Sequence, residues 1–503
     1  MSHSLHRAAV GTIVMLSLVA CGSTLEPRAV GTQDAQVQTI TAGGTPTTVA
    51  VPTSGASTTG TPSVAGSSAG PSINVLPAQG ATTTIAAGSS PTRASSATPT
   101  GPAVSAHTPI TIGFPYLDAA ASSTVLSGIG KGLASADGRA VADLEIAKIN
   151  KAGGLSGHPI KPYFYDINPN TSQSTYEQGA CDEFTQDHPV QVVFDFGMTD
   201  NFLRCALSGG VAGIVNANVT GYTDSDLASL SGAVFPNSIS LDRLAKIEVP
   251  RLVAAHWFQP GAKVGILYYE TAPYVAGEKV LEAELRARHI DVQDKIALHY
   301  VASTGDLTAL LTQMEGADLR FRSEGITNLM FVENNGFLSA GFGLEAGPQG
   351  YYPKYALSSD EPLGDLASNI SARELAGAEF VGWIPAQDVA DTSSIRPGGN
   401  ACLSYMHTHG QPITTANEKA GTIQICDEFD YLDAVVAAIP AGQALTRSTF
   451  VAATHSVGSS YHSDQTFGVD TANRSDGVDA IRMGAYSSGC KCFQYTSGEQ
   501  AIG

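Results

Sequence analysis

Residues 147–160 read AKINKAGGLSGHPI, which describes the end of a helix, a turn and the start of a strand. Apolar side chains before and within this segment fall on one side of a helix expected over residues 140–150. Gly153-Gly154 ends that helix, because glycine readily adopts the positive φ that a helix C-terminus needs. Gly157 then turns the chain into a strand over residues 160–166. The segment therefore predicts one helix–strand unit of an α/β fold.

The same alternation continues on both sides of this unit. Strands are expected at 110–114, 191–196, 213–217, 263–269, 296–301, 326–332 and 355–358, and helices at 174–185, 201–208, 241–258 and 275–289. Repeated βα units predict parallel sheets with helices on both faces. The alternation restarts at the long helix 241–258, and about 400 residues exceed a single core, so two lobes are expected. Facing lobes would place the carboxyl ends of their strands across one cleft, where ligands bind in such sheets.

Gly138-Arg139-Ala140 leads into the segment quoted above, and Asp166 closes the strand that follows it. This arrangement resembles the first helix and second strand of type I periplasmic binding proteins, in the branched-chain amino-acid-binding group. The resemblance implies two doubly wound parallel-sheet lobes joined by a three-crossing hinge. It places the crossings near 236–240, 376–381 and 456–464, which gives lobe 1 as about 108–238 and 377–458, and lobe 2 as about 239–376 and 459–503.

The resemblance also implies a ligand site in the loops that follow the strands. In the family, the loops after the third and fourth strands offer hydroxyls and backbone amides to the ligand. Here the first loop contains Thr199 and Asp200, and the second contains Asn218 and Thr220. Hydroxyls and free N–H groups at helix starts suit an anionic group such as a carboxylate. For Asp200 and Asn218, a helix-capping role is the alternative.

The second lobe is expected to contribute an aromatic side chain and carboxylates. Tyr274 follows its first strand, although Val275 stands where the family often has glycine. Glu333 and Asn334 end a later strand and Asp360 ends the next, so these side chains are placed to pair with a ligand ammonium. A capping or loop role is the alternative for each of them. The set predicts a small polar solute with its carboxylate facing lobe 1: an amino acid first, then an amide or a polyol.

Residues 1–20 are expected to form an export signal. Arg7 precedes an apolar stretch of about a dozen residues, which is shorter than the roughly 20 that span a bilayer. The stretch ends in Leu18-Val19-Ala20-Cys21, which resembles the lipobox of bacterial lipoproteins. The resemblance implies cleavage before Cys21, lipid on its thiol, and a location on the extracytoplasmic face of the cell membrane. An ordinary secretory signal is the alternative, and it too exports the protein.

Residues 21–107 predict a flexible tether. They are almost entirely Thr, Ser, Ala, Gly, Pro and Val, and they bury too little apolar surface to offset the entropy of ordering. Gly66-Ser67-Ser68-Ala69-Gly70 matches the hydrolase pattern GxSxG, but it lacks the strand and helix that this motif requires. The tether is therefore expected to hold the region 108–503 away from the membrane, without a catalytic serine of its own.

Apart from Cys21, the chain has six cysteines, and an even number predicts disulfides in an exported protein. Proximity in sequence favours three pairs: Cys181–Cys205, Cys402–Cys426 and Cys490–Cys492. The first two would close loops of about 24 residues, worth roughly 3 kcal/mol each in the chain-entropy model. A metal site is not expected, because paired CxxC units are missing and His407-Thr408-His409 is better explained as a solvated pair.

The composition favours binding over catalysis. There are 46 Asp+Glu against 27 Lys+Arg without a basic cluster, so nucleic acid is not an expected partner. No nucleophile has an evident base, and Gly128–Gly132 lacks the ending of a phosphate loop, so no enzyme activity or cofactor is expected. The predicted protein is a monomeric lipoprotein that closes around a small-molecule ligand for the permease of an ABC importer. A ligand sensor of the same fold and a structural envelope lipoprotein stay open as alternatives.

Overall fold

The computed structural model describes residues 108–117, 136–195, 198–215, 221–300, 304–334, 336–411 and 413–503, all within the unit Arg93–Gly503. Several predicted features lie outside these residues: the signal peptide, Cys21, the tether with its GxSxG match, the segment Gly128–Gly132, Asn218 and Thr220. Among the described helices, none has both the length and the apolar character needed to cross a membrane.

The first lobe is built on a five-stranded parallel sheet. Its strand order is β2-β1-β3-β4-β5, with β1 (Ile110–Tyr116), β2 (Ile160–Asp166), β3 (Val192–Asp195), β4 (Ala212–Val215) and β5 (Ala233–Val234). The connecting helices are α2 (Gly138–Ala152), α3 (Gln173–Asp182), the π-helical turn η1 (Glu183–Asp187), α4 (Asp200–Ser208) and α5 (Asp224–Ser229). Asp137 caps α2 by accepting the Ala140 N–H, and Gly153, at φ 116°, ends the helix as the sequence predicts.

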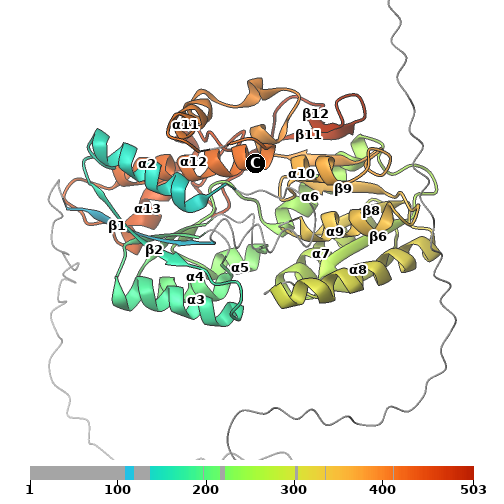
Figure 1. Ribbon diagram of the computed structural model, residues 1–503, viewed down its shortest axis with the longest axis horizontal. Helices are drawn as coiled ribbons and strands as arrows, with labels where there is room; N and C mark the ends of the chain where they lie inside the picture. The colour runs from blue at the N-terminus through green and yellow to red at the C-terminus, as the bar shows by residue number, and fades with distance from the viewer. Residues whose placement is uncertain are drawn as a thin grey trace, which may run out of the picture. The chain divides into compact units, whose positions relative to one another are not determined.

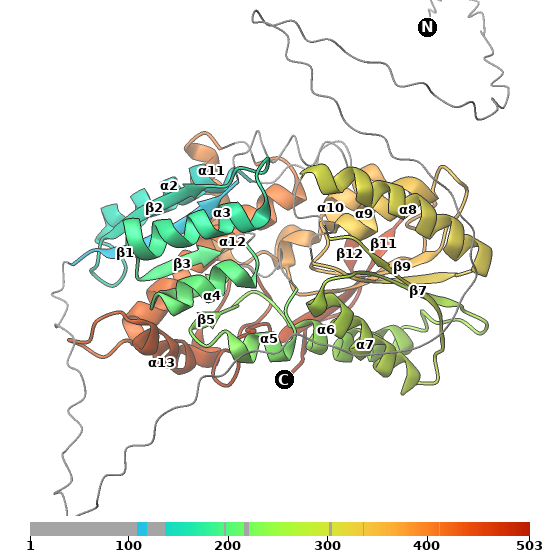
Figure 2. The ribbon, with the colours of Figure 1, turned by 90° about the horizontal axis from the view of Figure 1, so that it is seen from below.

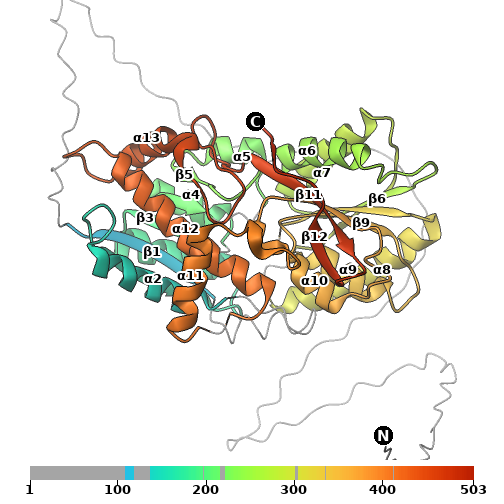
Figure 3. The same ribbon diagram turned by 90° about the horizontal axis from the view of Figure 1, so that it is seen from above.

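Helices from both halves of the chain cover this sheet. α11 (Pro397–Thr408), α12 (Ala416–Ala438) and α13 (Arg447–Val457) come from the C-terminal half and share an apolar core with α2 and the strands. Figure 3 shows α12 and α13 beside the strands of the first sheet. α3 and α4 pack with η1 in a separate cluster on the other face, below the strands in Figure 1. The sheet is therefore doubly wound.

The second lobe holds a larger sheet of order β12-β11-β10-β9-β8-β6-β7, with β13 paired to β11. Its parallel strands are β6 (Val264–Tyr269), β7 (Val292–Leu298), β8 (Asn328–Val332), β9 (Lys354–Ser358) and β10 (Glu379–Gly382). The strands β11 (Ala480–Ser487), β12 (Cys492–Tyr495) and β13 (Gln500–Ala501) add antiparallel pairs. The helices are α6 (Leu241–Ala254), α7 (Ala272–Arg286), α8 (Thr304–Glu324), α9 (Phe337–Ala346) and α10 (Leu363–Asn369).

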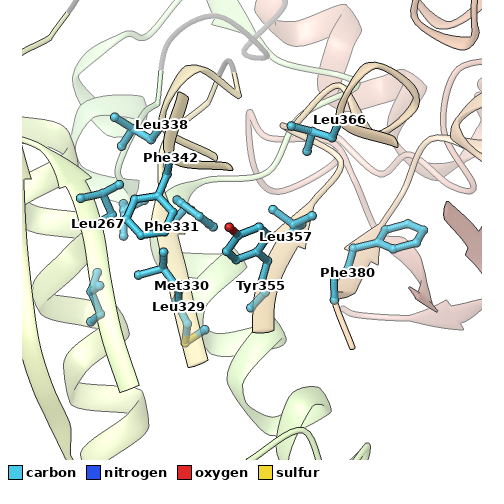
Figure 4. Packing of buried hydrophobic residues seen from close by; sticks show 14 of the residues in the cluster. Leu267, Leu329, Met330, Phe331, Leu338, Phe342, Tyr355, Leu357, Leu366 and Phe380 are labelled. Atoms are coloured by element: carbon cyan, nitrogen blue, oxygen red, sulfur yellow. The ribbon is translucent and has the colours of Figure 1, made fainter. Parts of the chain in front are cut away.

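This sheet too has helices on both faces. Figure 2 shows α6 and α7 on one side of it and α8 and α9 on the other. Figure 4 shows Phe342 of α9 packing on aromatic side chains from the strands, with ring centroids 6.5 Å from Phe331 and 6.3 Å from Tyr355. Each of these side chains is almost fully buried, which stabilises the fold by roughly 1.5–3 kcal/mol per side chain. The packing fixes the carboxyl ends of β8 and β9.

Three crossing segments join the lobes: 235–240, 383–396 and 458–479. Since β10 pairs with both β9 and β11, the second crossing begins only after Gly382, and the boundary expected near 376–381 is corrected by a few residues. The crossings contain three short 3-10 turns, η3 (Pro385–Gln387), η4 (Thr392–Ser394) and η5 (Gly458–Ser460).

The crossing segments are hydrogen-bonded to one another through Trp383, which is fully buried. Its Nε1–H donates to the Asn237 carbonyl at 3.2 Å, and its carbonyl accepts the Phe467 N–H at 3.0 Å. The hinge is thus a packed structure in which Trp383 links the three crossing segments of the chain.

All six described cysteines are joined in the pairs that proximity favours: Cys181–Cys205, Cys402–Cys426 and Cys490–Cys492. The first disulfide links α3 to α4, the second links α11 to α12, and the third closes the turn between β11 and β12. The first pair matters for the site, because α3 and the start of α4 carry its polar side chains.

Candidate functional site

A cavity of about 350 Å³ lies where residues that follow the strands of both lobes meet. The first lobe supplies the beginnings of α3, α4 and α5 and the segment before α5, and the second supplies the start of α7 and Tyr300, two residues after β7. The lining residues are Gln173, Ser174, Glu177, Thr199, Asp200, Asn201, Gly221, Tyr222, Asp226, Thr271, Pro273, Tyr274 and Tyr300. This is the cleft expected at the carboxyl ends of two facing sheets.

In the first lobe, the carboxylate of Glu177 occupies the hydrogen-bond donors of Thr199. The Thr199 N–H donates to Glu177 Oε1 at 2.8 Å, and its hydroxyl donates to Oε2 at 2.9 Å. Gln173 Nε2 adds a third bond, to Oε1 at 3.0 Å. Burial raises the pKa of Glu177, and the bonds from Thr199 and Gln173 act against this rise. The donors predicted to receive a ligand carboxylate therefore already hold one from the protein.

Thr199 also caps α4, so the capping role considered for Asp200 falls to its neighbour. The Thr199 hydroxyl oxygen accepts the Asn201 N–H at 3.4 Å. Asp200 lies in the first turn of the helix, lines the cavity, and forms an ion pair with Arg204 at 2.9 Å that is open to solvent. A pair so exposed contributes little to stability.

In the second lobe, Tyr274 bridges to the first. Its hydroxyl donates to Asn334 Oδ1 at 2.5 Å and accepts the Gly221 N–H at 3.0 Å. Its ring lies against that of Tyr300, with centroids 6.0 Å apart and planes at 26°. Burial raises the pKa of Tyr274 well above its usual value, so the hydroxyl stays protonated and can donate. One side chain thus lines the cavity and joins the two lobes.

Of the other predicted residues that the structure describes, Asn334, Glu333 and Asp360 do not line this cavity. Asn334 stands behind Tyr274 as its hydrogen-bond acceptor. Glu333 accepts the N–H groups of Leu338 and Ser339 at 2.7 and 2.8 Å, at the start of α9. Asp360 does not line the cavity, and its N–H donates to a serine side chain in the same turn. Within the described ranges, Thr199, Asp200 and Tyr274 are thus the predicted residues that line the cavity.

Sequence reasoning missed Glu177 and Tyr300. Both come after strands of the same two sheets, Glu177 on the helix that follows β2 and Tyr300 just beyond β7. The rule that ligands bind at the carboxyl ends of strands applies to those strands equally, and it would have found them.

A second, much smaller cavity of about 20 Å³ lies inside the second lobe, between α6, α7 and the ends of β8 and β9. The carboxyl groups of Glu248, Glu333 and Glu361 line it. Burial raises the pKa of Glu248 to about 8 and that of Glu333 to about 7, and it raises the pKa of Glu361 well above its usual value. Across the described ranges, no group of three or more His, Cys, Asp or Glu side chains is arranged to hold a metal ion.

No protein-family model matches the chain, and no curated protein matches its sequence. Solved structures match its fold. The fatty acid ABC transporter substrate-binding protein from Thermomonospora curvata is 13% identical, with a TM-score of 0.57, covering 80% of this chain and 94% of that chain. A solute-binding protein of an ABC transporter from Rhodopseudomonas palustris, in complex with p-hydroxybenzoic acid, is 14% identical with a TM-score of 0.56. The match covers 78% of this chain and 97% of that chain.

A third structure is the ABC transporter substrate-binding protein from Desulfitobacterium hafniense in complex with Leu. It is 13% identical, with a TM-score of 0.50, over 77% of this chain and 99% of that chain. At such identities the likeness shows a shared architecture: two α/β lobes of the type I periplasmic binding protein fold.

Proposed function

We propose that this chain is an extracytoplasmic solute-binding protein that captures a small polar molecule between its two lobes. The observation that carries the proposal is the cavity of about 350 Å³ whose walls come from both lobes. Its volume lies at the small end of the range for ligand pockets, roughly 300–1,000 Å³. A molecule that contacts both walls binds the closed arrangement more tightly than an open one, so capture and lobe closure are coupled.

The same proposal includes delivery of the solute to the permease of an ABC importer, with Cys21 as the lipid anchor. The fold shared with substrate-binding proteins of ABC transporters supports the transport role. The protein acts by binding alone, as a monomer. A lipid anchor on Cys21 would keep the protein within reach of the permease.

A ligand screen tests the proposal. The chain from Gly22 onward, which omits the signal peptide and the lipidated cysteine, is heated with amino acids, amides, amines, aromatic acids and polyols. A ligand at 100 times its Kd stabilises the native state by about 2.7 kcal/mol, which gives a clear rise in Tm. Small-angle X-ray scattering then measures whether the same ligand makes the protein more compact.

Two matched variants locate the site. Tyr300→Ala removes an aromatic wall of the cavity and should weaken the ligand found in the screen. Tyr352→Ala is the control, because Tyr352 is a partly buried tyrosine of the same lobe that does not line the cavity. If both variants bind the ligand as the parent does, or if the ligand leaves the scattering curve unchanged, capture between the lobes is wrong.

A further inference from the structure

The lobe 1 wall of the cavity has an unusual electrostatic arrangement. Glu177 is 3% exposed, and both of its oxygens accept hydrogen bonds from Thr199. A carboxylate offers about four acceptor positions, of which Thr199 and Gln173 use three. The sequence led us to expect a ligand carboxylate beside Thr199, and the carboxylate of Glu177 already occupies that place. One acceptor position of Glu177 is left.

No basic side chain among the other lining residues that the structure describes compensates this negative charge. Among the described residues that line the cavity there is no lysine, arginine or histidine, whereas Glu177, Asp200 and Asp226 all carry carboxylates. Asp200 is paired with Arg204, and Asp226 accepts the N–H and hydroxyl of Thr223 at 2.9 and 2.6 Å. Glu177 is the buried member of the three, and its hydrogen bonds come from neutral groups.

The opposite wall is aromatic. Tyr274 and Tyr300 come from the second lobe, and their rings stack with centroids 6.0 Å apart and planes at 26°. The faces of aromatic rings carry partial negative charge and attract ammonium groups more strongly where water is excluded. A cation that contacts Glu177 and an accessible ring face would meet favourable charge from both, whereas an anion would be repelled by the charge of Glu177.

From this geometry we propose that the cavity takes a small organic cation, an amine or quaternary ammonium compound without a carboxylate, and that Glu177 is the acceptor that selects it. The inference rests on the proposed function and names the ligand class of the same site. A ligand carboxylate would have to displace Glu177 from Thr199 and lie beside it as a like charge. The expected orientation, with the ligand carboxylate toward Thr199, is therefore replaced by one with its cationic group toward Glu177.

Calorimetry with probes matched in shape tests the inference. Choline is compared with 3,3-dimethylbutan-1-ol, its uncharged carbon isostere, and tyramine is compared with 4-hydroxyphenylacetate. We expect at least one cation to bind about tenfold or more tightly than its partner, as for a hydrogen bond or contact to a buried charge. Tighter binding of 4-hydroxyphenylacetate, or no binding of either cation at millimolar concentration, would overturn the inference. Either result leaves capture between the lobes standing if the wider screen finds another ligand.

Variants then assign the selectivity to Glu177. Glu177→Gln keeps the shape and an acceptor oxygen for Thr199 but removes the charge, so the preference for the cation should fall about tenfold. Glu177→Asp retains the charge and should keep the preference, even if affinity drops. Glu183→Gln is the control, because Glu183 follows Glu177 by six residues, lies in η1 and does not line the cavity. Circular dichroism and Tm confirm that each variant folds. An unchanged preference in Glu177→Gln contradicts the role of this residue.

Discussion

Replacing Glu248 with glutamine should stabilise the protein at pH 8 and have little effect at pH 5. Glu248 lies on α6 with 6% of its surface exposed, in the small cavity that it shares with Glu333 and Glu361. Burial raises its pKa from 4.5 to about 8. The folded protein therefore keeps a proton that the unfolded chain releases at pH values between these two.

The sign and size of the effect follow from this proton. Because the folded state binds more protons between pH 4.5 and about 8, stability falls as the pH rises through that window. At 1.36 kcal/mol for each pH unit, the full difference corresponds to roughly 5 kcal/mol, an upper value because solvent entering the cavity would reduce it. Glu333, with a pKa raised to about 7, adds to the loss over the lower part of the window.

Urea unfolding at pH 5, 6.5 and 8 measures the effect. The parent should lose stability steadily between pH 5 and 8, and Glu248→Gln should flatten this dependence because a glutamine stays neutral throughout. Glu315→Gln, at an exposed position on α8, is the control and should leave the slope unchanged. If the stability of Glu248→Gln falls with rising pH as steeply as that of the parent, Glu248 is ionised or solvated in the native protein. If the parent is more stable at pH 8 than at pH 5, the whole cluster is ionised and the reasoning fails.

Three further predictions concern the bridge between the lobes, the first disulfide and the anchor. Tyr274→Phe removes the hydroxyl that bonds Gly221 and should lower the free energy of unfolding by about 1–3 kcal/mol, measured by urea unfolding; an unchanged midpoint would mean that water replaces the bond. Joint Cys181→Ala and Cys205→Ala should cost about 3 kcal/mol, and peptide mapping of the parent should find this pair linked rather than crossed with another cysteine. Cys21→Ala should move the protein from membranes to the soluble fraction, since acyl chains supply roughly 0.8 kcal/mol per buried CH₂, and retention in the membrane fraction would contradict the lipobox.

Local sequence signals were sufficient where a strand or helix boundary is chemically marked. The strand expected at 160–166 is β2, residue for residue, because the turn at Gly157 marks its start and Asp166 marks its end. The helix α8 was not predicted, since Gly316 and the buried Asp318 interrupt its apolar pattern. The second hinge crossing was placed too early because the apolar run containing Trp383 continues from β10 into the hinge, and both are buried.

The site residues likewise divide into those that the sequence predicted and those that it did not. Thr199 and Tyr274 were predicted because the resemblance implies a site in the loops that follow particular strands, and both residues line the cavity at the carboxyl ends of those strands. The partner of Thr199 is Glu177, 22 positions earlier and on another helix. Its approach depends on how α3 packs against α4 and on the disulfide between them, and neither contact leaves a periodic signal in the sequence.

The two buried glutamates are the reason why we propose the reverse of the ligand orientation expected from sequence. Glu333 and Glu177 do the same local work, because each accepts N–H groups at the start of a helix, where partial positive charge favours a carboxylate. The oxygens of Glu333 accept hydrogen bonds from the start of α9 inside the second lobe. Glu333 does not line the cavity, so it is not placed to bind a ligand ammonium there. Glu177 accepts hydrogen bonds from the start of α4 on the cavity wall itself, where, as we propose, it disfavours a ligand carboxylate and offers its remaining acceptor position to a cation. A protein carboxylate thus lies at the start of a helix at both places, as the sequence-based rule predicts. Because the carboxylate at the start of α4 belongs to the protein, we propose that the ligand brings a cation instead.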